Sequence, residues 1–175
     1  MFARAQASSA CDEALVRIAA GDLDAISEIY DHCGKKIFFL AKSITGNDAD
    51  SQDVLQNTVL KIMNSAKDYT PGTNAVAWIL TVARSCALSL VRQRKDYLPI
   101  DERLEKVADK SDHTEYAALY DALDRLDPDE RQIVVMKVQL SMKHKDIANL
   151  LGISVDASQK RYRRAVKKLN QYYCR

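Results

Sequence analysis

The sequence is poor in the residues that make turns, with only 5 glycines and 3 prolines among 175 residues. It also contains no convincing run of alternating apolar and polar residues, which is the pattern of a half-buried strand. With 47% hydrophobic residues, the chain can still bury one medium core or two small ones. These features together predict an all-α fold.

Several kinds of segment and site are also missing. No uninterrupted apolar stretch approaches the roughly 18 residues of a membrane span, and the first residues lack the hydrophobic region of a signal peptide. The 4 cysteines are scattered, with no CxxC pair and no histidine at ligand spacing. This distribution favours reduced thiols in a cytoplasmic protein over a disulfide framework. We therefore expect no membrane insertion, no metal and no cofactor.

The charges are strongly segregated along the chain, although the net charge is only +2. Residues 137–175 contain ten Lys/Arg and two acids, whereas residues 96–136 contain five Lys/Arg and twelve acids. A basic block of this size is suited to contacts with nucleic-acid phosphates. The simpler alternative is a solvated helix face, which most basic runs are.

The basic block contains the pattern of two helices joined by a tight turn. Apolar residues at helical spacing precede Gly152, a residue that commonly ends helices, and Asp156 is placed to cap the next helix. Ser158 falls on the apolar side of this second helix. Its opposite side carries the cations Lys160, Arg163, Arg164 and Lys167. Such a pair of helices predicts a DNA-binding helix-turn-helix.

The rest of the chain is predicted to form two helical domains with a flexible acidic linker. Asn74 is a candidate cap for the last helix of the first domain, and Gly46 is the candidate stop of the helix over 22–44. Asp127, Pro128 and Glu130 form a start signal of the capping-box type in the second domain. The predicted helices of the first domain cover 12–20, 22–44, 49–66 and 74–95, and the domain boundaries are 1–95, 96–112 for the linker and 113–175.

Two helices of the first domain have outward faces that a simple bundle does not need. In the helix over 49–66, Leu60 lies among polar residues, which indicates either a protein contact or a single exposed leucine. In the helix over 74–95, Trp78 lies outside the core stripe, on the side of Thr81, Ser85 and Arg92. This arrangement suits stacking on unpaired bases, but periodicity slightly favours the alternative, in which Trp78 packs beneath the preceding loop or against the first helix.

Ordered motifs across both domains resemble those of bacterial extracytoplasmic-function sigma factors, a group within the sigma-70 superfamily. The resemblance covers residues 23–95 and 116–170. Its motifs are Asp53-Val-Leu-Gln56, Trp78-Ile-Leu-Thr-Val-Ala-Arg84, Leu126-Asp-Pro-Asp-Glu-Arg131, Asp146-Ile-Ala148, Leu151-Gly152-Ile-Ser154 and Arg161-Tyr-Arg-Arg-Ala165.

The resemblance implies a dissociable subunit of RNA polymerase that directs promoter recognition, promoter melting and transcription initiation. The residues that it implies for binding core RNA polymerase are Asp53, Gln56, Asn57 and Leu60. Those implied for the minus-ten promoter element are Lys67, Tyr69, Thr70, Asn74, Trp78, Thr81, Arg84, Ser85 and Arg92. Those implied for the minus-thirty-five element are Gln159, Lys160, Arg161, Arg163, Arg164 and Lys167, with Arg161 on the DNA backbone. An anti-sigma factor is a further implied partner.

Two other functions remain to be weighed against this one. An autonomous helix-turn-helix regulator would act without polymerase, but no dimerisation helix is evident. An enzyme is not expected, because the sequence has no phosphate-binding glycine loop and its three histidines are far apart. As a further hypothesis, the acidic middle could lie against the basic C-terminal helix and limit DNA binding by the free protein.

Overall fold

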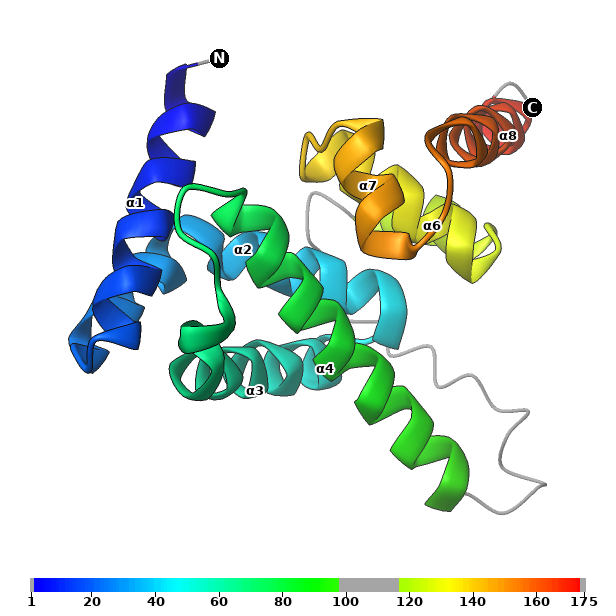
Figure 1. The fold of residues 1–175 in the computed structure, drawn as a ribbon. Helices are drawn as coiled ribbons and strands as arrows, with labels where there is room; N and C mark the ends of the chain where they lie inside the picture. The colour runs from blue at the N-terminus through cyan, green and yellow to red at the C-terminus, as the bar shows by residue number, and fades with distance from the viewer. Residues whose placement is uncertain (1, 98–116, 174–175) are drawn as a thin grey trace.

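The computed structural model describes residues 2–97 and 117–173, and both ranges are helical (Figure 1). No strand occurs in either range, so the predicted all-α fold is confirmed. The first block consists of α1 (Phe2–Ala19), η1 (Leu23–Ala25), α2 (Ile26–Thr45), α3 (Asp48–Ser65), η2 (Ala66–Asp68) and α4 (Ala75–Tyr97). The second consists of α5 (Ala117–Asp124), α6 (Pro128–Val134), the π-helical η4 (Val135–Gln139), α7 (His144–Leu151) and α8 (Val155–Tyr173).

Three predicted helix ends are confirmed. Asn74 caps α4, because its Oδ1 accepts a 3.1 Å hydrogen bond from the backbone N–H of Ala77. Gly46 follows α2 with φ 84° and Gly152 follows α7 with φ 66°, a left-handed conformation that glycine adopts without strain.

The two predicted aspartate caps have different outcomes: Asp127 is the N-cap residue of α6 with Pro128 in the first position, as predicted, whereas Asp156 is not a cap. Asp127 precedes α6, but its side chain makes no capping hydrogen bond and instead contacts Lys168 on α8. Asp156 lies inside α8, and Ser154 is the cap, since its Oγ accepts a 3.1 Å hydrogen bond from the N–H of Ala157. The Asp127 carboxylate is therefore paired with the ammonium group of Lys168 rather than with a backbone N–H of α6.

The boundaries of the helices also differ from those predicted: the helix predicted over 22–44 begins with the short 3-10 helix η1, and α2 itself starts at Ile26. α1 begins at Phe2, ten residues before the predicted start, and α4 continues to Tyr97. The predicted acidic linker therefore falls almost wholly in 98–116, outside the described residues, as does the predicted start of the second domain.

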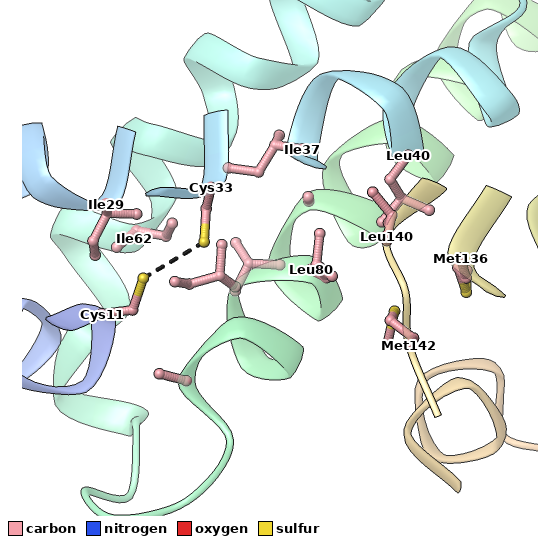
Figure 2. Close-up of a cluster of buried hydrophobic side chains, with 14 of the residues drawn as sticks. Cys11, Ile29, Cys33, Ile37, Leu40, Ile62, Leu80, Met136, Leu140 and Met142 are labelled. Carbon is pink, nitrogen blue, oxygen red and sulfur yellow. Dashed lines mark hydrogen bonds between the residues drawn. The ribbon is translucent and has the colours of Figure 1, made fainter. Parts of the chain in front are cut away.

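The core of the first block lies where α2 packs against α3 and α4, with α1 across them. Ile29, Ile37, Ile62 and Leu80 are fully buried there (Figure 2). Cys11 of α1 and Cys33 of α2 are buried free thiols, with their sulfurs 3.5 Å apart.

The helix α4 contains a window, Ala75–Arg94, that is long and apolar enough by composition to cross a membrane. It is not an uninterrupted apolar run, because polar residues such as Thr81, Arg84 and Ser85 lie within this segment. In the structure α4 packs against α1, α2 and α3, as a core helix of a bundle does.

The two blocks share one apolar core, which the sequence did not predict. α2 contacts both α6 and η4, and α4 contacts α7. Leu40 of α2 belongs to the same buried cluster as Met136, Leu140 and Met142 of the second block (Figure 2). The second block therefore packs directly on the first through buried side chains.

This shared core predicts a cost for shortening Leu140, which is 6% exposed. Leu140→Ala is expected to lower the free energy of unfolding by about 2–5 kcal/mol, because it leaves a cavity between packed helices. Urea denaturation followed by circular dichroism measures this change. Val138→Ala removes apolar atoms from a side chain that is 58% exposed two residues earlier; its effect should stay within about 0.5 kcal/mol. Equal effects of the two changes would contradict the prediction.

Candidate nucleic-acid interfaces

The outward side of α3 forms one continuous exposed surface. Its opposite side is buried against α2 and α4 through residues such as Val54, Leu55 and Ile62. Leu60 is 57% exposed at the end of the outward side, among the largest exposures of an apolar side chain in the described residues. We call this surface the α3 outer face, and it consists of Asp53, Gln56, Asn57 and Leu60.

The loop between α3 and α4, residues 67–74, combines one buried residue, Tyr69, with an exposed tip. Tyr69 is only 6% exposed and its hydroxyl donates a hydrogen bond to Asp12 of α1. Lys67, Thr70 and Asn74 are all exposed. In this conformation the loop therefore presents its tip, and not the ring of Tyr69, to a ligand.

Trp78 lies beneath this loop. Its side chain is half-buried, and its ring centroid is 5.6 Å from that of Tyr69. This placement matches the interpretation in which Trp78 packs against the loop. Further along α4, the side chains of Thr81, Ser85 and Arg92 are exposed on the surface.

Two residues predicted to contact minus-ten DNA already have protein partners. Ser85 Oγ accepts a 3.2 Å hydrogen bond from Lys61 Nζ of α3. Arg84 is half-buried, and its Nε donates a 3.3 Å hydrogen bond to Gln132 Oε1 of α6. The contact with Gln132 joins the two blocks, so Arg84 is engaged by the second block in this arrangement.

In the second block, α7 and α8 form the predicted helix-turn-helix. Ser158 is fully buried, as its position on the apolar side of α8 predicts, and its Oγ is hydrogen-bonded to His144 Nδ1 of α7 at 3.0 Å. Burial, together with the nearby cations Lys137 and Arg163, lowers the pKa of His144. The neutral imidazole can therefore support the polar contact between the two helices.

The outward face of α8 carries the predicted cations. Lys160 forms an ion pair with Asp156 one turn earlier, at 2.8 Å. Gln159 is half-buried and accepts a 3.5 Å hydrogen bond from Arg163. We call the exposed cations of this helix the α8 basic face, and they are Lys160, Arg163, Arg164 and Lys167.

Two further cations of α8 face the protein. Arg161 Nη1 lies 2.9 Å from Asp129 Oδ2 of α6, so the residue predicted to contact the DNA backbone is paired within the domain. Lys168 Nζ lies 2.8 Å from Asp127 Oδ2 and 2.7 Å from Glu130 Oε2. The hydrogen bond from Lys168 lowers the pKa of Asp127. These pairs fix α8 on α6.

The sequence did not predict three residues that position these surfaces: Asp12, Gln132 and Lys168. Each makes its contact with a residue more than 35 positions away in the chain, as the separations of 57, 48 and 41 residues show. The only sequence signal of these contacts was the pair of acids at the start of α6, Asp127 and Glu130, and their pattern was interpreted as a capping box. Within 2–97 and 117–173, no group of three metal-ligating side chains comes together.

Comparison with known families matches both blocks. Sigma-70 region 2 matches residues 29–97, and Sigma-70, region 4 matches residues 116–169. The RNA polymerase sigma factor CarQ of Myxococcus xanthus is 30% identical over 162 residues, covering 89% of this chain and 92% of that protein. The ECF RNA polymerase sigma factor EcfG of Rhodopseudomonas palustris is 27% identical over 135 residues, covering 74% and 75%.

Solved structures show the same fold. A structure of CnrH in complex with the cytosolic domain of CnrY aligns over 94% of this chain and 97% of CnrH, with a TM-score of 0.73 and 24% identity. The sigma factor RpoE of Bartonella quintana, solved with the anti-sigma factor NepR, aligns over 78% and 89%, with a TM-score of 0.71 and 20% identity. Because both sigma-70 regions match in order and a sigma factor matches along nearly the whole chain, the protein belongs to the extracytoplasmic-function sigma factors of the sigma-70 family.

Proposed function

We propose that three separate surfaces divide the work of this sigma factor. The α3 outer face binds core RNA polymerase, the loop 67–74 with the exposed side of α4 binds the minus-ten element, and the α8 basic face binds the minus-thirty-five element. The observation that carries the proposal is the exposure of each surface on a domain that matches the corresponding sigma-70 region.

The α3 outer face has the composition of a protein contact. A large apolar side chain surrounded by polar ones can anchor an interface, while its neighbours set orientation and exclude water. Leu60 is such an anchor, and Asp53, Gln56 and Asn57 are its polar surroundings.

The α8 basic face can supply both contributions to duplex recognition, namely contacts with phosphates and contacts with base edges. Its cations neutralise phosphates and release counterions, and an arginine that reaches a guanine edge adds about 1–3 kcal/mol of discrimination. Arg161 and Lys168 support this surface by holding α8 on α6. Because Arg161 is paired with Asp129, we assign the contact with the DNA backbone to Lys167. Arg161 stabilises the packing of α8 on α6 instead.

The packed arrangement of the two domains describes the protein away from promoter DNA. The minus-ten and minus-thirty-five elements are centred about 25 base pairs apart, which is about 85 Å of straight duplex. A compact chain of this length has a radius of gyration of only about 16 Å. Engagement of both elements therefore requires the shared apolar core around Leu40 and Leu140 to open, and opening also releases Arg84 from Gln132.

The protein acts in the cytoplasm, where core RNA polymerase and promoter DNA are found. An anti-sigma factor is the natural regulatory partner, since the structures of CnrH and RpoE each contain a second protein. As a subunit that directs transcription, it has no enzymatic reaction of its own to perform.

Transcription in vitro tests the proposed function. Core RNA polymerase is incubated with fragmented genomic DNA of the source organism, with and without this protein, and the transcript ends are sequenced. Start sites that require the protein and share upstream sequence elements are expected. If the protein adds no start sites, the autonomous regulator becomes the better explanation.

A substitution on α8 tests the minus-thirty-five surface. Arg164→Ala in the holoenzyme is expected to weaken binding to a promoter duplex by about 1–3 kcal/mol, through the loss of one charged contact to the DNA. Fluorescence anisotropy at several salt concentrations measures it. Lys35→Ala on α2 removes the same charge from an exposed position outside α8 and serves as the matched control. Equal losses from the two variants would argue for a diffuse charge effect instead.

A further inference from the structure

The N-terminal helix α1 holds the loop between α3 and α4 through a single carboxylate. Asp12 Oδ1 accepts a hydrogen bond from the hydroxyl of Tyr69 and a second, 2.8 Å long, from the backbone N–H of Gly72. The match to Sigma-70 region 2 begins only at residue 29, so Asp12 lies outside it.

The two hydrogen bonds fix the loop at the buried Tyr69 and at its exposed tip, Gly72. Burial, followed by the hydrogen bond to Asp12, raises the pKa of Tyr69, so the hydroxyl remains a donor. Gly72 is in the left-handed region with φ 78°, which directs its N–H inward to the carboxylate. Thr73 Oγ1 closes the turn with a 2.7 Å hydrogen bond to the carbonyl oxygen of Thr70.

The contacts of Tyr69 extend the support to α4. Its ring lies 5.6 Å from that of Trp78, so the loop rests on α4 from one side and is held by α1 from the other. The exposed backbone between Tyr69 and Asn74 is therefore preorganised by contacts that lie behind it. A binding loop that is held in its bound shape gains affinity and selectivity, because less conformational entropy is lost on binding.

We propose that Asp12 is a positioning residue for minus-ten recognition, which shapes residues 69–73 for minus-ten DNA without touching the DNA itself. This inference rests on the proposed function of the loop. The chemistry is specific to an acceptor at this position, because both of its partners are donors.

Substitutions at Asp12 separate positioning from general stability. Asp12→Ala removes both hydrogen bonds, whereas Asp12→Asn keeps an acceptor oxygen of the same size and reach. Glu13→Ala is the matched control, since it removes a carboxylate from the next, exposed position of α1. Tyr69→Phe keeps the ring and removes one of the two donors, and it provides the test if Asp12→Ala does not fold.

The experiment uses holoenzyme and promoter templates in which the minus-ten region is randomised and held open by mismatches. Sequencing of the transcripts gives the base preference at each position. We expect Asp12→Ala to reduce the preference by about fivefold or more at the minus-ten position where the wild-type preference is strongest, which is the size of one base contact. Asp12→Asn and Glu13→Ala should keep the wild-type preference within about twofold, and Tyr69→Phe should be intermediate.

The possible results separate the role of Asp12 from the proposed minus-ten function of the loop. A folded Asp12→Ala variant with unchanged base preference overturns the role of Asp12, even if its total transcription is lower. A wild-type protein without any minus-ten preference overturns the proposed function of the loop, and the inference with it. Preference at the minus-thirty-five element should be the same in all variants.

Discussion

Leu60→Asp is expected to abolish co-elution of the protein with core RNA polymerase in gel filtration. Leu60 is 57% exposed, so the substitution introduces a charge without disturbing the core of the first block. At an interface, the same carboxylate would be removed from water without a partner. The loss of an apolar anchor typically weakens binding by at least about 2 kcal/mol, and an unpaired buried charge adds to that loss.

A matched substitution on the second block shows whether the loss of polymerase binding depends on where the new charge is placed. Val138→Asp introduces the same charge in a side chain that is 58% exposed, and this variant should co-elute with polymerase like the wild type. Circular dichroism should show the same helical content for both variants. Co-elution of Leu60→Asp would keep the protein among polymerase subunits but would remove the α3 outer face as the contact.

The outward faces were predictable because they depend only on helical periodicity. Leu60 on α3 and the cations of α8 lie on exposed sides, where spacing of 3.6 residues per turn places them. Ser158 was predicted on the buried side for the same reason, and it is fully buried. Helix ends marked by Asn74, Gly46 and Gly152 were also predictable from local chemistry.

The remaining features depend on contacts between distant residues. Asp127 looked like a cap from its neighbours, but Lys168 lies 41 residues away and competes for the carboxylate. Asp12 showed no local pattern at all, because both of its donors come from the loop after α3. Periodicity identifies the apolar side of a helix but not the helix that covers it. The shared core around Leu40 and Leu140 therefore could not be predicted from the sequence either.

The separation of the two domains on the promoter is expected to produce a large change in fluorescence energy transfer. A donor and an acceptor dye are attached through non-natural amino acids at Asp31 on α2 and Gln171 on α8, both exposed. The native cysteines then stay unmodified. Transfer should be efficient in the free protein, where α2 contacts α6 and η4. It should fall strongly in the complex of holoenzyme with promoter DNA, where the domains must reach elements about 85 Å apart.

The physical reason for this change is a competition between two sets of contacts. Closing the domains buries apolar side chains around Leu140 and uses Arg84 to contact Gln132. Opening exposes those apolar surfaces, so it occurs only when polymerase and DNA bind the open form more tightly than the closed one. Leu140→Ala weakens the closed form and should lower transfer in the free protein. If transfer in the promoter complex stayed at the value of the free wild-type protein, the domains would bind DNA without separating, and the assignment of both α4 and α8 to promoter elements could not hold.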